Sequence, residues 1–124
     1  MAARLSSVGH EVVVGSRSKY RAMEKVDALL AKWPDLDLSL QAGDNEDAAG
    51  CELVVIATPW DSAASTALSV ADLLEGKVLI AMSNALAKVG DEFQPLVPPR
   101  GSVAAHIQAT IPGAAVAAAF HHVP

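Results

Sequence analysis

The feature that most constrains the fold of this chain is the alternation of short apolar runs with segments of helical periodicity. Three apolar runs predict buried strands: EVVVG at Glu11–Gly15, CELVVIAT at Cys51–Thr58 and KVLIAM at Lys77–Met82. Between the first two runs, Ser18–Lys32 has apolar residues at helical spacing and is followed by Pro34, which ends a helix. Strands that alternate with helices form right-handed crossovers and a parallel sheet. The sequence therefore predicts an α/β fold in which helices flank a parallel sheet.

Weaker signals complete the order of elements. They predict an edge strand at Leu36–Leu40 and a short helix that ends at Gly over Asp44–Gly50. A helix over Asp61–Leu74 is predicted to be capped by Asp61 and stopped by Gly76. A long loop is predicted at Ser83–Arg100 and a further helix at Ser102–Thr110. The last segment, Ala114–Phe120, is predicted to be a strand. Because it is rich in alanine, a helix remains an alternative there.

Length and composition narrow the class of protein. The 124 residues suffice for one domain and not for two, so residues 1–124 are predicted to be a single domain. The net charge is −5 without a block of like charges, whereas a nucleic-acid partner normally requires a basic stripe. Cys51 is the sole cysteine, which excludes a disulfide within the chain and suits a reducing compartment. No apolar run reaches the roughly 18 residues that suggest a membrane span, and no signal peptide is recognisable. We expect a cytoplasmic protein without membrane or nucleic-acid partners.

The residues after the first predicted strand favour a phosphate site. In Rossmann-type dinucleotide-binding folds, the end of the second strand meets the adenosine ribose, where an acid favours NAD and an Arg favours the 2′-phosphate of NADP. Here Ser16 and Arg17 follow the strand, and no acid does. The Ser16 hydroxyl can donate a hydrogen bond, and the Arg17 guanidinium can bind phosphate with two. Arg21 lies one helical turn later, on the same predicted face. The alternative is a solvated basic start to the helix.

The end of the second apolar run suits a flat ligand. Small residues there would let a ring or a pyrophosphate approach the backbone, Pro59 would fix the turn, and Trp60 could form a wall. The candidate residues are Ala57, Thr58, Pro59 and Trp60. The alternative is a strand-to-helix turn with a tryptophan in the core.

His121 is a candidate at the end of the last predicted strand. A lone histidine is more often structural than catalytic, and with His122 it has no metal-ligand spacing, so no metal site is predicted. The carboxylates are scattered without an acid–base pair, and no catalytic side chain is predicted.

Together these stretches resemble the NADPH-dependent deazaflavin (coenzyme F-420) reductase family. The resemblance covers nearly the whole chain, and its motifs are specific in combination, because GSR, ATPW and FHHVP fall at the expected strand ends. It is carried by VGHEVVVGSRS, NEDAAGCELVVIATPW, KVLIAMSNAL, PLVPPRGSVAAHIQATIPG and AAFHHVP.

The resemblance implies an NADP-dependent oxidoreductase domain that transfers hydride between nicotinamide C4 and deazaflavin C5, with NADP and coenzyme F-420 as cofactors. Hydride transfer depends mainly on positioning two rings, so no proton-transferring side chain is required. The deazaflavin is the implied small-molecule partner, and a homodimer stays open. The resemblance implies that the 2′-phosphate is held by Ser16, Arg17 and Arg21. It implies that the dinucleotide path is lined by Ala57, Thr58 and Pro59, and that the nicotinamide–deazaflavin cleft is bordered by Trp60 and His121.

The chain departs from the family at its start. The family's domain opens with a strand and a Gly-rich phosphate loop, whereas Met1–Val8 looks like the tail of the helix that follows that loop. The missing strand is central in the order 3-2-1-4-5-6, so its absence should part the sheet and open two apolar edges. We therefore expect a fragment or a start-site error, unless the flanking strands pair directly or another subunit fills the gap. The family's carboxyl-terminal helical region would lie beyond Pro124.

Two other functions stay open at this point. An imine reductase related to pyrroline-carboxylate reductase would share the amino-terminal fold and pair it with a different helical domain. A nucleotide-binding fragment without catalysis is the other alternative, because the activity of this chain alone does not follow from its residues.

Overall fold

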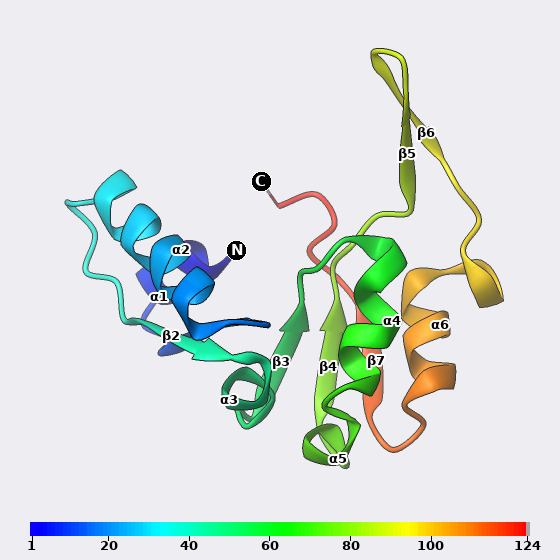
Figure 1. Ribbon diagram of the computed structural model, residues 1–124, viewed down its shortest axis with the longest axis horizontal. Helices are drawn as coiled ribbons and strands as arrows, with labels where there is room; N and C mark the ends of the chain where they lie inside the picture. The colour runs from blue at the N-terminus through cyan, green and yellow to red at the C-terminus, as the bar shows by residue number, and fades with distance from the viewer. Residues whose placement is uncertain (124) are drawn as a thin grey trace. The chain divides into compact units, whose positions relative to one another are not determined.

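The computed structural model describes residues 1–123 and divides them into two compact units (Figure 1). We call Met1–Cys51 the N-unit and Glu52–Val123 the C-unit. The N-unit contains α1 Ala2–Ser7, β1 Val12–Ser16, α2 Lys19–Lys32, β2 Leu40–Asp44 and α3 Asn45–Ala49. The C-unit contains β3 Leu53–Ile56, α4 Trp60–Leu68, α5 Ala71–Leu74, β4 Val78–Ala81, β5 Leu86–Val89, β6 Glu92–Pro95, η1 Pro99–Gly101, α6 Val103–Thr110 and β7 Ala115–Ala118.

The N-unit is a strand–helix–strand crossover followed by a short helix. β1 and β2 pair in parallel, from Val12 opposite Leu40 to Ser16 opposite Asp44. Gly15 allows α3 to lie against β1, because a Cβ built on it would be only 2.6 Å from the Cβ of Ala48. The predicted strand at the start, the helix α2 and the short helix α3 are confirmed to within a few residues.

The edge strand of the N-unit lies later than predicted. The alternation in Leu36–Leu40 suggested a strand there, whereas β2 begins at Leu40. Its sequence, LQAGD, has a low intrinsic preference for strand. Pairing with β1 stabilises it nevertheless, and Gly43 is required because a Cβ there would lie 2.7 Å from the Cβ of Asp47. Tertiary packing thus overrides the local pattern.

The C-unit is built on a three-stranded parallel sheet in the order β3–β4–β7. Helices α4 and α6 lie side by side on one face of this sheet (Figure 1). The core between them is apolar, with Leu74, Leu79 and Ile107 fully buried. The strands are less enclosed than their apolar sequences suggested, since Leu53 and Val78, which pair with each other, are 51% and 48% exposed.

The alanine-rich segment near the end of the chain is a strand, as predicted, and not a helix. β7 pairs in parallel with β4. The side chain of Gln108 on α6 reinforces it, because its amide nitrogen donates to the Ala114 carbonyl at 2.7 Å and its oxygen accepts from the Val116 amide at 2.9 Å. These two bonds satisfy backbone groups that poly-alanine alone would place in a helix.

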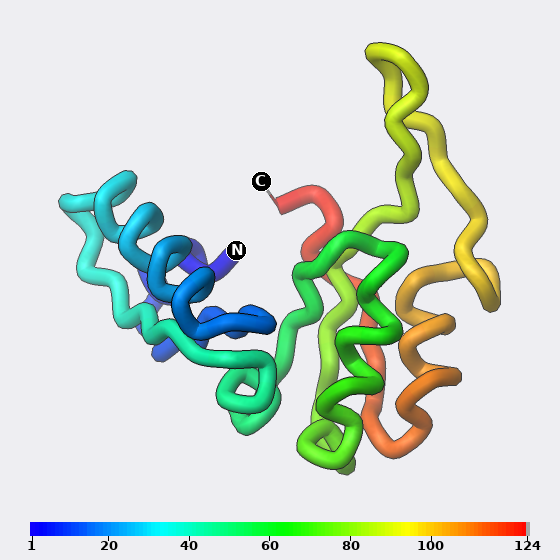
Figure 2. Tube along the Cα trace, viewed as in Figure 1, coloured from blue at the N-terminus to red at the C-terminus, as the bar shows by residue number. Residues whose placement is uncertain are grey.

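Two predicted segments differ in the structure. The helix predicted over Asp61–Leu74 breaks between α4 and α5, where the Ser69 hydroxyl donates to the Thr66 carbonyl and Val70 turns into the core. The long loop predicted over Ser83–Arg100 contains the antiparallel hairpin β5–β6, which extends away from the parallel sheet (Figure 2). Its two-residue turn uses Gly90 at φ +62°, a conformation that glycine adopts without strain.

Each unit has strands in an order that matches one part of a Rossmann fold. The β2–β1 pair corresponds to strands 3-2 and the β3–β4–β7 sheet to strands 4-5-6 of the order 3-2-1-4-5-6. The expected parting of the sheet is confirmed, because β1 pairs with β2 alone and β3 with β4 alone within residues 1–123. Direct pairing of the flanking strands, one of the ways to fill the gap, does not occur there.

Among the same residues, no helix has both the length and the apolar character to cross a membrane.

Candidate functional site

The first group of predicted site residues lies at the carboxyl end of β1. Ser16 is the last residue of the strand and is half-buried. Arg17 and Arg21 are exposed, and within residues 1–123 neither guanidinium pairs with a carboxylate. Because Ser18 precedes α2 with an extended backbone, Arg17 lies outside the helix, and the prediction that it shares a helical face with Arg21 is wrong. The group still offers one hydroxyl and two unpaired cations within six positions of the chain.

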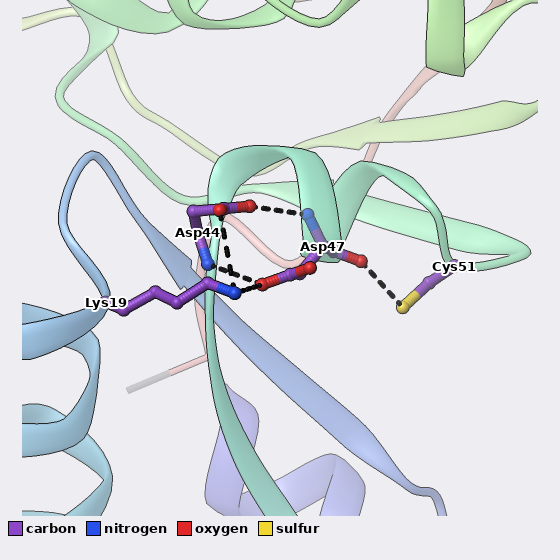
Figure 3. Close-up of polar contacts among 4 residues, drawn as sticks. All are labelled: Lys19, Asp44, Asp47 and Cys51. Atoms are coloured by element: carbon purple, nitrogen blue, oxygen red, sulfur yellow. Dashed lines mark hydrogen bonds and ion pairs between the residues drawn. The ribbon is translucent and has the colours of Figure 1, made fainter.

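An ion-pair cluster adjoins this group, and the sequence analysis did not anticipate it (Figure 3). The Lys19 ammonium, at the start of α2, lies 2.9 Å from the Asp47 carboxylate and 3.8 Å from the Asp44 carboxylate. Asp44 and Asp47 form a reciprocal capping box at the start of α3, in which each carboxylate accepts from the other residue's amide. Cys51 closes the turn, with its thiol 3.9 Å from the Asp47 carbonyl.

The cluster also shifts the titration of its members. The hydrogen bond that Lys19 donates to Asp47 raises the pKa of the Lys19 ammonium, and the two nearby carboxylates act in the same direction. The same hydrogen bond lowers the pKa of the Asp47 carboxyl, helped by the amide of Asp44. Both ionised forms are therefore favoured over a wide pH range.

The second group lies at the carboxyl ends of β3, β4 and β7 in the C-unit. Thr58 follows β3, and its carbonyl accepts a hydrogen bond from the Ser83 hydroxyl, which follows β4. Asn84 donates from its side-chain amide to the His121 carbonyl, beyond the end of β7, at 3.1 Å. The three strand ends are thus tied together by side chains, although Asn84 and His121 are 37 positions apart.

The segment that carries His121 is a tight turn with a strained start. Phe120 has φ +67°, which is unfavourable for a bulky residue, and the Val123 amide bonds back to the Phe120 carbonyl at 3.1 Å. The bond from Asn84 fixes the carbonyl in the middle of this turn. Strain that is held by neighbouring groups is common where a ligand must be positioned.

The remaining predicted residues surround the start of α4. Ala57 and Pro59 are exposed, while Trp60 is half-buried as the first residue of the helix. Pro59 occupies the N-cap position, so Asp61 stands in the first turn and does not cap the helix as predicted. The Thr58 hydroxyl oxygen is buried and has no hydrogen-bond partner among the described residues. An unpartnered buried hydroxyl is costly, and a ligand group is one way to satisfy it.

Five polar residues at these strand ends escaped the sequence analysis: Lys19, Asp44, Asp47, Ser83 and Asn84. The signal for the last two was available, since they directly follow the strand predicted at Lys77–Met82. Lys19 and its carboxylates could not be assembled without knowing that Ser16 lies opposite Asp44.

Each of the two groups suits a different kind of ligand group. In the N-unit, two unpaired guanidinium groups and a hydroxyl at a parallel strand end suit a phosphate dianion. In the C-unit, small residues and an unsatisfied hydroxyl at strand ends suit a flat polar ring.

The comparison with known families decides the relationship. The profile of the family described as NADP oxidoreductase, coenzyme F420-dependent, matches residues 1–85. The chain belongs to this family.

Two named relatives are similar to this chain over different shares of its length. The F420-dependent NADP reductase of Methanocaldococcus jannaschii is 30% identical over 128 residues, which cover 99% of this chain and 57% of that protein. The enzyme of the same name from Methanothermobacter marburgensis is 32% identical over 81 residues, covering 64% of this chain and 36% of that protein. The chain therefore spans little more than half the length of the first of these relatives, and about a third of the second is matched.

Solved structures agree with the fold. A candidate F420-dependent NADP reductase from Arthrobacter sp. FB24 superposes with a TM-score of 0.79 at 29% identity, covering all of this chain and 58% of that one. A hypothetical protein from Sinorhizobium meliloti superposes with a TM-score of 0.75 at 23% identity, covering 99% of this chain and 56% of that one. The second likeness supports the Rossmann-type fold alone.

Proposed function

We propose that this chain supplies the NADP-binding part of an oxidoreductase that transfers hydride between NADPH and coenzyme F420. The observation that carries the proposal is the group at the end of β1, where Ser16, Arg17 and Arg21 offer a hydroxyl and two guanidinium groups that pair with no carboxylate of residues 1–123. Membership of the coenzyme F420-dependent family supports it. The relatives named F420-dependent NADP reductase supply the identity of the second substrate.

In this proposal each group of residues takes one part of the cofactor. Ser16, Arg17 and Arg21 hold the 2′-phosphate, and an Arg at this strand end favours NADP over NAD. Thr58 lines the dinucleotide path with Ala57 and Pro59, and its unsatisfied hydroxyl supports that role. Trp60 and His121 border the cleft for the two rings.

The bound nicotinamide supplies the hydride chemistry. The residues of this chain bind and orient the cofactor, and positioning alone lowers the barrier of a direct transfer substantially. We further propose that residues 1–124 act as one domain in the cytoplasm. Its partner is a small molecule, neither nucleic acid nor a membrane, and a homodimer is compatible with this assignment.

Calorimetric titration of the chain with NADPH and with NADH tests the proposal. NADPH should bind about tenfold or more tightly than NADH, because each charged hydrogen bond to the 2′-phosphate contributes about 1.5–3 kcal/mol. Arg17→Ala should abolish most of this preference. The matched control is Lys25→Ala, which removes an exposed cation from α2 that is outside the group. Equal affinities for the two cofactors in the unmodified chain would refute an NADP site.

Turnover of coenzyme F420 by the same chain separates the enzyme from a binding fragment. Oxidation of NADPH that depends on added coenzyme F420 would extend the proposal to the whole reaction. Selective NADPH binding without turnover would favour a nucleotide-binding role for this chain alone.

A further inference from the structure

Negative charge stands directly beside the proposed 2′-phosphate group. Asp44 ends β2 and is the register partner of Ser16, which ends β1. Neighbouring strands lie about 4.8 Å apart, so the two residues occupy adjacent places at one edge of the sheet. An acid that meets the ribose favours the free 2′-hydroxyl of NAD and opposes a phosphate. β1 itself ends without an acid, but the paired strand brings one to the same edge.

Lys19 holds this carboxylate and a second one. Its ammonium contacts the Asp47 carboxylate at 2.9 Å and the Asp44 carboxylate at 3.8 Å (Figure 3). It stands two positions after Arg17 in the chain, as the first residue of α2. The Lys19 side chain is 61% exposed and the two carboxylates are 38% and 45% exposed. All three groups are therefore in contact with solvent and close to the proposed phosphate.

The charge at this edge depends on that one ammonium. With Lys19 present, the cluster of Lys19, Asp44 and Asp47 carries a single negative charge, which Arg17 and Arg21 outweigh. Without Lys19, the formal charges of the two carboxylates and the two guanidinium groups would sum to zero, which weakens the attraction for a phosphate dianion. Exposed ion pairs stabilise a fold only slightly, so an effect on the fold alone accounts poorly for this placement.

We propose that Lys19 is a specificity-determining residue, which screens Asp44 and Asp47 and so allows Ser16 and Arg17 to accept the 2′-phosphate of NADP. The inference rests on the proposed NADP site and adds a requirement to it. Lys19 acts through the carboxylates and needs no contact with the cofactor. Its effect is electrostatic, so it weakens as salt is added.

Lys19→Met tests the inference with two matched ligands, adenosine 2′,5′-bisphosphate and 5′-AMP, which differ in the 2′-phosphate. The preference for the bisphosphate should fall by about 3- to 10-fold at low ionic strength, as expected for the loss of one charge near a phosphate. The affinity for 5′-AMP should stay within about twofold, because the uncharged 2′-hydroxyl is insensitive to the change. At high salt, the difference in preference between Lys19→Met and the unmodified chain should become smaller. Lys25→Met is the control for the removal of a cation from α2.

A second substitution separates electrostatics from structure. Asn at position 44 keeps a side-chain oxygen for the α3 cap and removes the charge. Asp44→Asn should restore the preference in the Lys19→Met background and should raise it above the unmodified level on its own. The single Asp44→Asn variant also decides the matter if Lys19→Met does not fold.

The outcomes distinguish this inference from the function beneath it. An unmodified chain without preference for the bisphosphate would refute the NADP site and the inference together. A clear preference that Lys19→Met leaves unchanged would overturn the inference alone. Loss of the preference that Asp44→Asn does not restore would also overturn it, because Lys19 would then act by holding α2 to α3.

Discussion

The two units end their parallel strands in different ways. At the carboxyl ends of β1 and β2 the side chains are mostly charged and exposed. Lys19 is shared between two carboxylates, and Arg17 pairs with none among residues 1–123. At the carboxyl ends of β3, β4 and β7 they are neutral, and Ser83 and Asn84 bond to backbone carbonyls. The carboxyl ends of the parallel strands thus carry charged side chains of both signs in the N-unit, and a backbone fixed by hydrogen bonds in the C-unit.

Under the proposed function, this difference suits the two parts of the dinucleotide. A phosphate is recognised at its charge, and exposed ions serve binding at little cost to stability. A nicotinamide ring must be held in one orientation, for which a backbone fixed by side chains such as Asn84 is suited. In the proposed function, the N-unit recognises the 2′-phosphate and the C-unit places the ring.

Ile107→Ala should have the largest effect, which is to lower the free energy of unfolding of the C-unit and not that of the N-unit. Ile107 is fully buried between α6 and the sheet, and such a truncation costs about 2–5 kcal/mol. The loss is measured by urea unfolding, monitored through the amide hydrogen exchange of β3, β4 and β7. Leu68→Ala, at a site 56% exposed, is the matched truncation and should cost less than about 1 kcal/mol. Equal losses for the two variants would contradict the description of the core.

Asn84→Ala sharpens the comparison at the strand ends. Removing the bond to the His121 carbonyl should speed hydrogen exchange of residues 120–123 and weaken NADPH binding by about 3- to 10-fold, the equivalent of one hydrogen bond. Adenosine 2′,5′-bisphosphate, which lacks the nicotinamide, should bind unchanged. Asn84→Asp, whose carboxylate has a similar shape and cannot donate the bond, should show a loss of NADPH affinity at least as large. A variant that weakens both ligands equally would show that Asn84 supports the fold in general.

Two buried hydroxyls provide a third test. The Ser6 hydroxyl in α1 and the Thr58 hydroxyl after β3 are both buried without partners within residues 1–123. Ser6→Ala and Thr58→Val should each raise stability by about 1 kcal/mol in thermal unfolding, because an unsatisfied group is removed. Only Thr58→Val should also weaken NADPH binding. If neither variant affects binding, the Thr58 hydroxyl has no role toward the cofactor.

The smallest effect concerns pH. The pKa of Asp47 is lowered, so its pairing with Lys19 stabilises the fold fully above the ordinary Asp pKa of about 3.9 and is lost as the pH falls through the lower native value. The pKa of Lys19 is raised, so the same contribution is lost as the pH rises through its native value above about 10.4. The melting temperatures of the unmodified chain and Lys19→Met should differ most between about pH 5 and 9. A difference that is constant from pH 2 to about 9 would contradict the pairing.

The sequence predicts the strands with continuous apolar runs and the residues that follow them, because burial and chain direction place these without further information. It does not predict β2, whose LQAGD sequence becomes a strand through pairing with β1. The hairpin was missed although Gly90 and Asp91 at its turn were a usable signal, since the nearby prolines suggested a loop.

Contacts between residues at the ends of different strands are harder to predict from the sequence. Lys19 meets Asp44 and Asp47 through a register that local patterns do not specify, and Asn84 meets His121 across 37 positions. Both depend on which strands are neighbours, and they are the contacts that turn isolated candidate residues into groups.

The central proposal is that the strand ends of the N-unit bind the 2′-phosphate of NADP and that those of the C-unit bind its nicotinamide end. Hydrogen–deuterium exchange of the chain with NADPH, compared with adenosine 2′,5′-bisphosphate at matched saturation, tests it most directly. NADPH should protect residues 16–21 together with residues 57–60 and 120–123, and the bisphosphate should protect residues 16–21 alone. Protection of the same segments by both ligands, or protection by NADPH confined to one unit, would contradict the claim.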